Sequence, residues 1–203
     1  MSFERFNVVF DLGGVVLTWD PAAILHSVLT EAGPRDVVRR EVFEHDDWQE
    51  LDRGTLSPDI AQARFAARTG LSPHDIGRLM DRVAPSLTPI AQTLDLIRRI
   101  KARGHRLFCL SNMHLQSIRY LEQQYDFWHL FDGIVISSYI HMIKPEPEIY
   151  THLLTKHNLR PDETVFIDDL QVNLDAAAEQ GIRTVRFVSP HDCESCLRAV
   201  LEI

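Results

Sequence analysis

Five short runs of β-branched and aromatic residues alternate along the chain with stretches of helical periodicity, and this alternation constrains the fold more than any other feature. The apolar runs are residues 8–10, 106–110, 133–136, 164–167 and 183–188. Turn or cap residues bound each run, as is typical of short buried strands. Apolar residues at three- and four-residue spacing predict helices in residues 90–102, 115–124, 147–157 and 174–180. Strands that alternate with helices predict an α/β fold built on a parallel sheet.

Residues 20–84 break this alternation. Their helical periodicity is interrupted at glycine and proline residues, and no convincing strand occurs. A chain of 203 residues with 45% hydrophobic composition can bury one substantial core and a small additional module. We therefore predict a Rossmann-like core of about five strands, residues 1–17 and 85–203, with a small helical cap, residues 18–84, inserted after the first strand. Because ligands bind at the carboxyl edge of such sheets, the cap would close over a site.

Polar side chains follow three of the predicted strands at the point where each strand ends. Asp11 follows the first run, Ser111 and Asn112 follow the second, and Asp168 and Asp169 follow the fourth. In a parallel sheet with right-handed crossovers, residues just past the strand ends gather along one edge. The sequence therefore predicts a single polar site at that edge.

The acidic residues of this site require a cation, because crowded carboxylates repel one another. Oxygen ligands, with no His or Cys in these motifs, favour Mg²⁺ over zinc. Mg²⁺ commonly binds a substrate phosphate as well. The donors predicted for the phosphate oxygens are Lys144, Ser111 and the backbone amides near Gly13 and Gly14. Asp11 would then attack phosphorus in line and form an acyl phosphate that water hydrolyses.

Four segments resemble the ordered motifs of the haloacid dehalogenase superfamily: residues 10–16, 110–112, 144–147 and 166–173. The helical insert is similar to the small type-one cap of that superfamily. Within it, the chain resembles phosphatases of α-D-glucose 1-phosphate and the N-terminal phosphatase domain of soluble epoxide hydrolase. The resemblance implies a Mg²⁺-dependent phosphatase that acts on a small phosphorylated metabolite, such as a sugar phosphate, through an aspartyl-phosphate intermediate.

The resemblance implies a role for each residue of this sequence that matches a functional position of the superfamily motifs. The implied catalytic residues are Asp11 as nucleophile, with Ser111 and Lys144. The implied metal ligands are the Asp11 carboxylate, the Gly13 carbonyl and the Asp169 carboxylate. Substrate contacts are implied for Gly13, Gly14, Ser111, Asn112 and Lys144. Asp168 would orient Lys144 or a metal-bound water, and Asn173 would hold an outer water.

Gly13 departs from the pattern, because phosphatases of this superfamily usually have an aspartate there that protonates the leaving oxygen. A general acid contributes about 10²–10⁴-fold to the rate, so we expect a preference for good leaving groups such as anomeric and acyl phosphates. As a hypothesis, a residue of the insert could substitute, and the polar cluster of His45, Asp46 and Asp47 offers the candidates.

Two other functions remain open at this point. One is hydrolytic dehalogenation of 2-haloacids on the same scaffold, in which Asp11 would attack carbon without Mg²⁺. The other is a catalytically impaired module that binds a phosphometabolite or a partner protein, an interpretation favoured by Gly13.

Charge and composition limit the kinds of partner and the cellular location that we expect. The net charge is −8 and no basic run occurs, which argues against a nucleic-acid partner. No apolar run approaches about 18 residues and no signal peptide precedes the first strand, so we expect a cytoplasmic protein without a membrane partner. Three cysteines, Cys109, Cys193 and Cys196, are too few for a disulfide framework. The sequence does not indicate an oligomeric state.

Overall fold

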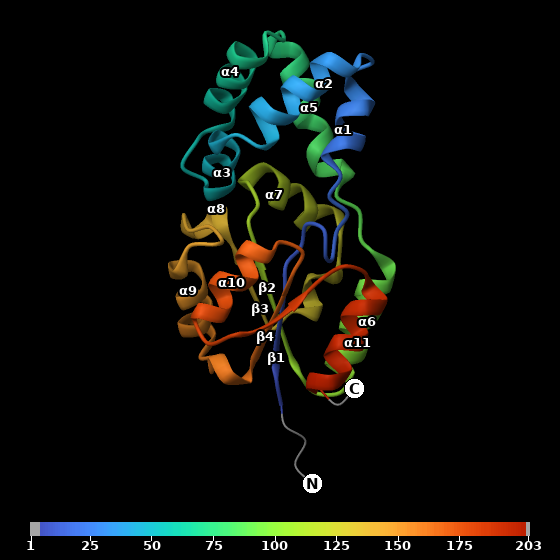
Figure 1. Ribbon diagram of the computed structural model, residues 1–203, viewed down its shortest axis with the longest axis vertical. Coiled ribbons are helices and arrows are strands. Elements are labelled where there is room, and N and C mark those ends of the chain that lie inside the picture. Colours follow the sequence, from blue (N-terminus) through green and yellow to red (C-terminus); the bar gives the residue numbers. More distant parts are fainter. Residues whose placement is uncertain (1–4, 202–203) are drawn as a thin grey trace.

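A five-stranded parallel sheet forms the centre of the computed structural model, which describes residues 5–201 (Figure 1). Its strands are β1 (Asn7–Phe10), β2 (Arg106–Ser111), β3 (Gly133–Ile136), β4 (Thr164–Asp168) and β5 (Arg183–Arg186). The spatial order is β3-β2-β1-β4-β5, and every neighbouring pair is parallel. The predicted α/β class and all five predicted strands are confirmed.

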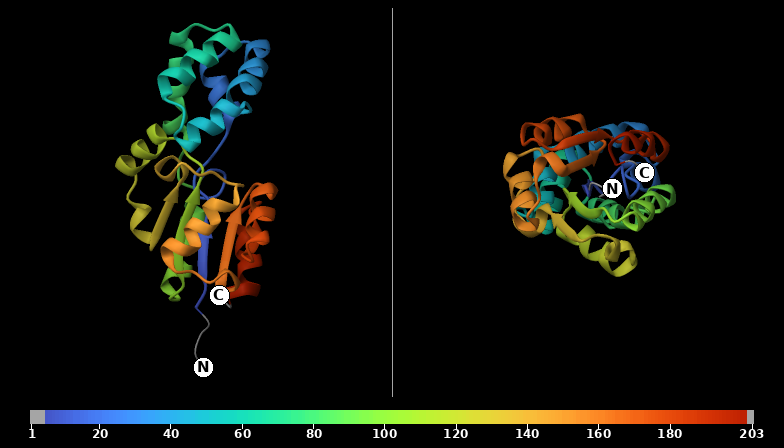
Figure 2. Two further views of the ribbon diagram at one scale, coloured as in Figure 1. Left: turned by 90° about the vertical axis from the view of Figure 1, so that its left-hand side faces the viewer. Right: turned by 90° about the horizontal axis from the view of Figure 1, so that it is seen from below.

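Helices cover both faces of the sheet, as Figures 1 and 2 show. On one face, α6 (Ala91–Ala102), α7 (Leu115–Gln124) and α11 (Pro190–Leu201) contribute to one buried cluster. On the other face, α9 (Pro147–His157) and α10 (Gln171–Glu179) contribute to a second. Side chains of a strand alternate between the two clusters, so Val8 and Phe10 pack on the first face and Val9 on the second. Burial on both faces explains why these strands appear in the sequence as continuous apolar runs.

Short helical turns complete the core. The turns are η2 (Phe127–Leu130), α8 (Ser137–Ile140) and η3 (Pro161–Glu163). Within residues 5–201, no helix combines the length and the hydropathy that crossing a bilayer requires.

A separate layer of helices lies beyond the carboxyl ends of the strands, at the opposite end of the molecule from the start of β1 (Figure 1). It consists of α1 (Pro21–Val28), α2 (Ala32–Val38), the π-helical turn η1 (Arg39–Phe43), α3 (Asp46–Arg53), α4 (Pro58–Thr69) and α5 (Pro73–Ser86), which we call the cap helices. They bury a third hydrophobic cluster among themselves. Ser57 and Ser72 cap α4 and α5, each followed by proline at the first helical position.

The C-terminal end of α3 is fastened to the core. The Arg53 guanidinium donates two hydrogen bonds of 2.6 Å to the Glu146 carboxylate, just before α9. The Ser137 hydroxyl donates to the Asp52 carbonyl. Gly54 follows in the left-handed conformation and lies against the backbone of Ser138. This end of α3 is therefore held where the sheet edge and the cap helices meet.

We predict that Gly54→Ala lowers the free energy of unfolding more than Gly70→Ala does. Both glycines have positive φ, 80° and 72°, at the C-terminal end of a cap helix, so each substitution adds about 1–2 kcal/mol of backbone strain. A Cβ at Gly54 would lie 2.8 Å from the Ser138 carbonyl oxygen, whereas a Cβ at Gly70 meets nothing within 4 Å. The Gly54 variant should lose about 1–3 kcal/mol more in urea unfolding. Equal losses would contradict the contact between α3 and α8.

Candidate active site

A cavity of about 220 Å³ lies between the carboxyl ends of the strands and the cap helices. The core lines it with Asp11, Gly13, Asn112, Met113, His114, Ser117, Lys144, Asp169, Leu170 and Asn173. The cap side contributes Trp19, Trp48, Asp52, Val83 and Leu87. The floor is therefore polar and charged, and most of the cap side is apolar.

Asp11 sits on the floor at the end of β1. Its backbone N–H donates to the Ile167 carbonyl at 3.0 Å, which extends the pairing of β1 with β4 by one residue. Its Oδ1 accepts a hydrogen bond of 2.7 Å from the Leu12 N–H and lies 2.9 Å from Lys144 Nζ. The carboxyl group is thus fixed by the strand behind it and by one buried cation.

Lys144 is 3% exposed and connects two acids. Its Nζ lies 2.7 Å from Asp168 Oδ2, besides the contact with Asp11. The Asn112 side-chain amide binds the backbone of Lys144 at both groups, donating to its carbonyl and accepting from its N–H at 2.8 Å each. The loop after β2 therefore sets the position of the lysine.

The two adjacent aspartates after β4 have different surroundings. Asp168 is fully buried, and its Oδ1 accepts from the Leu170 N–H and the Asn173 side-chain amide at 2.9 and 3.0 Å. Asp169 is only partly buried and lines the cavity. Gly14, with φ of 75°, lies so close that a Cβ there would be 2.7 Å from Asp169 Oδ2. Glycine is required at position 14 to admit this carboxylate.

The charges of the floor do not balance by themselves. Asp11, Asp168 and Asp169 each place one oxygen within 4.8 Å of the others. Burial raises the pKa of Asp11, Lys144 lowers it, and Asp168 raises it. Burial alone would lower the pKa of Lys144, yet Asp11 and Asp168 raise it, so this side chain stays an ammonium. One ammonium and one divalent cation would neutralise three carboxylates, and the all-oxygen donor set fits Mg²⁺.

Most of the predicted site residues line this cavity, but Ser111, Gly14 and Asp168 do not. Ser111 is buried at the end of β2, where Asn112 and Met113 form the wall. The N–H of Gly14 donates to the Leu17 carbonyl at 2.8 Å, so in this conformation that amide is not directed at a substrate. The side-chain amide of Asn112 is likewise taken up by Lys144.

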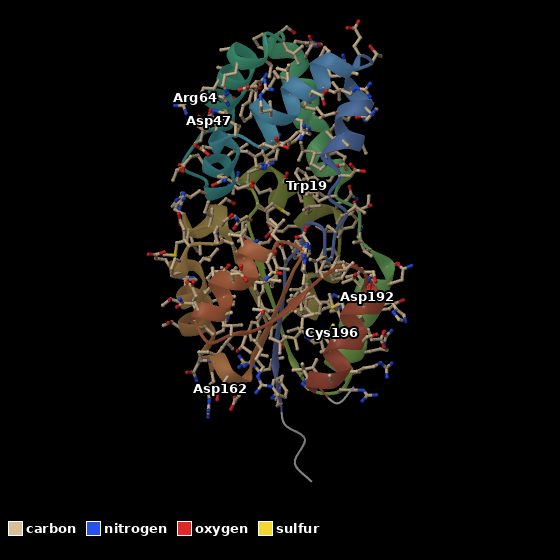
Figure 3. The ribbon with its side chains drawn as sticks, viewed as in Figure 1. Trp19, Asp47, Arg64, Asp162, Asp192 and Cys196 are labelled. Carbon is tan, nitrogen blue, oxygen red and sulfur yellow. The ribbon has the colours of Figure 1, made fainter. Side chains whose placement is uncertain are left out.

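The hypothesis that His45, Asp46 or Asp47 supplies an acid to the site is wrong, because none of them reaches the cavity. Asp47 accepts hydrogen bonds of 2.7 Å from Arg64 and Arg68 on α4. Figure 3 shows Asp47 and Arg64 together on the outer side of the cap helices, away from Trp19. His45 caps α3 by accepting from the Asp47 N–H, and Asp46 is exposed. This cluster stabilises the start of α3.

Aromatic side chains form the cap side of the cavity. The Trp48 ring lies 6.0 Å from Trp19, 4.8 Å from Phe43 and 5.7 Å from His114, measured between ring centroids. Both ring nitrogens of His114 contact Ser117, and burial lowers the pKa of His114 to about 4, so the ring is neutral. This wall offers a substrate few free hydrogen-bonding groups.

Asp52 is an ionisable cavity residue that sequence reasoning missed. It lies four residues after Trp48 on α3, so the two share one face of the helix. That spacing was visible in the sequence, but the direction in which the face points depends on how α3 docks on the core.

Comparisons with known proteins agree with this architecture. A model of the haloacid dehalogenase-like hydrolase family matches residues 60–187. A sesquiterpene phosphatase of Aspergillus oryzae is 29% identical over 174 residues, covering 86% of this chain and 85% of that protein. A D-ribitol-5-phosphate phosphatase of Bacteroides thetaiotaomicron is 23% identical, covering 96% and 98%. The bifunctional epoxide hydrolase 2 of Mus musculus is 38% identical over 73 residues, which are 36% of this chain and 13% of that protein.

Solved structures share the fold. A haloacid dehalogenase family enzyme from Bacteroides thetaiotaomicron, in complex with magnesium and inorganic phosphate, has a TM-score of 0.66 at 22% identity. The match covers 90% of this chain and 93% of that one. The predicted likeness to the superfamily and to the epoxide hydrolase phosphatase domain is confirmed.

We predict that Lys144→Met lowers the free energy of unfolding by about 3–5 kcal/mol in EDTA at pH 8, because it leaves the buried carboxylates without their cation. Burial already raises the pKa of Asp11 to about 7, and without the Lys144 ammonium this folded-state pKa would rise further above the unfolded value. Raised acid pKa values destabilise the folded state at high pH, and the penalty fades as pH falls through them. The deficit against wild type should therefore shrink between pH 8 and pH 5 in urea titrations.

The exposed Lys156 provides the control, since Lys156→Met removes the same charge from the surface of α9. It should unfold like wild type at every pH. If the loss of stability in Lys144→Met did not change with pH, this would contradict the balance of charge among Lys144, Asp11 and Asp168.

Proposed function

The chain belongs to the family of haloacid dehalogenase-like hydrolases, and we propose that it is a Mg²⁺-dependent phosphatase that hydrolyses a small organic phosphate monoester through an aspartyl-phosphate intermediate. The observation that carries this proposal is the buried group of Asp11, Lys144 and Asp168, with Asp169 beside it on the cavity floor. It combines a fixed nucleophile, a buried cation and a free carboxylate at one sheet edge.

Each floor residue has a proposed task. Asp11 attacks phosphorus with one carboxylate oxygen while Lys144 holds the other and neutralises charge on the phosphate. Asp11, the Gly13 carbonyl and Asp169 are the proposed holders of Mg²⁺, which when bound neutralises the phosphate oxygens. Asp168 and Asn173 keep Lys144 and an outer water in place. Ser111 and the backbone of Asn112 are the proposed phosphate contacts at the end of β2.

Relatives support the reaction class. Two of the similar proteins carry phosphatase names, and the similar solved structure contains magnesium and inorganic phosphate. We also propose residues 18–84 as the cap and residues 1–17 and 85–203 as the catalytic core. In that arrangement the cap helices would shield an acyl phosphate from bulk water.

We predict Mg²⁺-dependent turnover of p-nitrophenyl phosphate that Asp11→Asn reduces by about four orders of magnitude or more, because an amide cannot form the phosphoenzyme. Chelation by EDTA should abolish turnover, and added Mg²⁺ should restore it. The assay follows p-nitrophenolate absorbance. Asp162→Asn is the matched control, since Asp162 is exposed at the opposite end of the core (Figure 3).

The same assay separates the two alternative functions. A 2-haloacid dehalogenase would release halide without Mg²⁺ and would have no use for the acidic pair Asp168 and Asp169. A binding module would show no turnover with or without Asp11. Either result would contradict the phosphatase proposal.

The organic part of the substrate has two candidate classes. A sugar phosphate, as predicted from the sequence, is supported by the similarity to the D-ribitol-5-phosphate phosphatase. An apolar alkyl or terpenoid phosphate is supported by the similarity to the sesquiterpene phosphatase and by the cavity wall of Trp19, Trp48, Val83 and Leu87. Polyol hydroxyls would find few partners on that wall, since His114 is already bonded to Ser117. The wall therefore favours the apolar class.

We predict that kcat/KM rises along a series of n-alkyl phosphates by up to about fourfold per methylene, because each buried methylene contributes about 0.8 kcal/mol. The rise should end when the cavity is filled. Glucose 1-phosphate and ribitol 5-phosphate, assayed alongside by phosphate release, should fall below the longer alkyl esters. A flat series with a sugar phosphate as the best substrate would support the first class instead.

A further inference from the structure

Hydrolysis of an unactivated phosphate ester requires a proton donor for the departing oxygen, because an alkoxide is a poor leaving group. In phosphatases of the superfamily an aspartate usually supplies this proton, but this chain has Gly13 at the matching position. This inference rests on the proposed phosphatase function and asks which side chain of the cavity supplies the proton.

The chemistry of the cavity leaves one candidate. Among the described residues that line it, the ionisable side chains are Asp11, Asp52, His114, Lys144 and Asp169. Asp11 and Asp169 have the tasks of nucleophile and metal ligand. Lys144 is bound to two carboxylates, and His114 is neutral with both ring nitrogens directed at a neighbouring serine. Of these five residues, only Asp52 has no other proposed role.

Asp52 faces the floor from the opposite wall. It lines the same cavity as Asp11, from the last turn of α3. Hydrogen bonds from the His114 backbone N–H and the Trp48 side chain hold its carboxyl group, and the charges of Asp11 and Lys144 are close enough to act on it. An in-line attack by Asp11 from the floor would direct the departing ester oxygen toward the cap side of the cavity, which Asp52 lines.

The segment that carries Asp52 is anchored at two points, Asp52 and Arg53, to the core around the floor. The Asp52 carbonyl accepts from the Ser137 hydroxyl, which in turn accepts from the Met113 N–H at 2.8 Å. The next residue, Arg53, forms the double hydrogen bond with Glu146. These contacts tie α3 to the loop after β2 and to the segment that bears the lysine. A side chain fixed in this way is suited to a directed proton transfer.

We propose that Asp52 is the general acid and base of this site. In the first step Asp11 forms a bond to phosphorus, the bond from phosphorus to the ester oxygen breaks, and Asp52 gives its proton to that oxygen, which leaves as the alcohol. In the second step the Asp52 carboxylate takes a proton from water, whose oxygen attacks phosphorus. The bond to Asp11 breaks, phosphate leaves, and both aspartates return to their starting states.

The electrostatic surroundings agree with this assignment. Burial raises the pKa of Asp52 to about 7, although the hydrogen bonds from His114 and Trp48 oppose the rise. A carboxyl group in this range can give a proton and take it back near neutral pH. Asp47, on the same helix, has its pKa lowered because Arg64 and Arg68 outweigh its desolvation, and it could not do the same.

The test compares Asp52→Asn with Asp46→Asn, which makes the same chemical change on an exposed position of the same helix. Both are assayed with Mg²⁺ against dinitrophenyl, p-nitrophenyl, phenyl and hexyl phosphate, in order of increasingly poor leaving group. We expect Asp52→Asn to lower kcat/KM by about 10²–10⁴-fold for hexyl phosphate and by less than about threefold for dinitrophenyl phosphate. Asp46→Asn should follow wild type throughout.

A second readout isolates the base role. The value of kcat/KM reports the steps up to the phosphoenzyme, whereas kcat includes its hydrolysis. With dinitrophenyl phosphate, Asp52→Asn should therefore release a burst of dinitrophenolate equal to the enzyme concentration, followed by slow turnover. The variant should fold, because a neutral amide replaces a desolvated carboxyl group, and urea unfolding checks this. Asp52→Ala should give the same dependence on leaving group.

Three results would overturn the role of Asp52. An equal loss of kcat/KM for all four esters would indicate that Asp52 only positions the cap. A profile parallel to wild type without a burst would indicate that another group transfers the proton. Wild-type protein without Mg²⁺-dependent turnover of any ester would refute the phosphatase proposal itself, and the role of Asp52 with it.

Discussion

The buried contact between Lys144 and the two carboxylates of Asp11 and Asp168 is the interaction on which the site depends. Breaking such a pair leaves an uncompensated buried charge, which is far more costly than forming the pair is favourable. The fold therefore supports it from every side: Asn112 holds the lysine backbone, and Asn173 holds Asp168. These contacts join the ends of β1, β2 and β4 to the segment after β3, so they fix this edge of the sheet around Asp11, the proposed nucleophile.

Much of this arrangement could be predicted from the sequence because its determinants are local. Strands buried on both faces appear as apolar runs, and the parallel order then places Asp11 and Asp169 at one edge whatever the details of packing. The helix α11 was not predicted, although Ser189 caps it by accepting from the Asp192 N–H and Pro190 stands at its start. That capping pattern was a legible signal.

The candidate acids chosen from the sequence lie at the end of α3 that does not reach the cavity, and the reason is physical. A cluster of His45, Asp46 and Asp47 is conspicuous in the sequence, but the arginines that neutralise Asp47 lie 17 and 21 residues further along. Only the docking of α3 against the core decides that Asp52 faces inward. Side-chain direction across an interface between two packed layers is a property of that packing, and single-sequence periodicity does not contain it.

The two adjacent glycines after Asp11 show how the chemistry is divided between core and cap. Gly14 is imposed by space, because a Cβ would collide with Asp169, but a Cβ at Gly13 would meet only Trp19, at 3.8 Å. The missing acid at Gly13 is therefore not a steric necessity of the core. If the acid belongs to α3, phosphoryl transfer from an alkyl ester is possible only while the cap helices are seated on the core. The apolar wall around Trp48 then has a second effect, since a substrate that fills it excludes the water that would otherwise lower the pKa of Asp52.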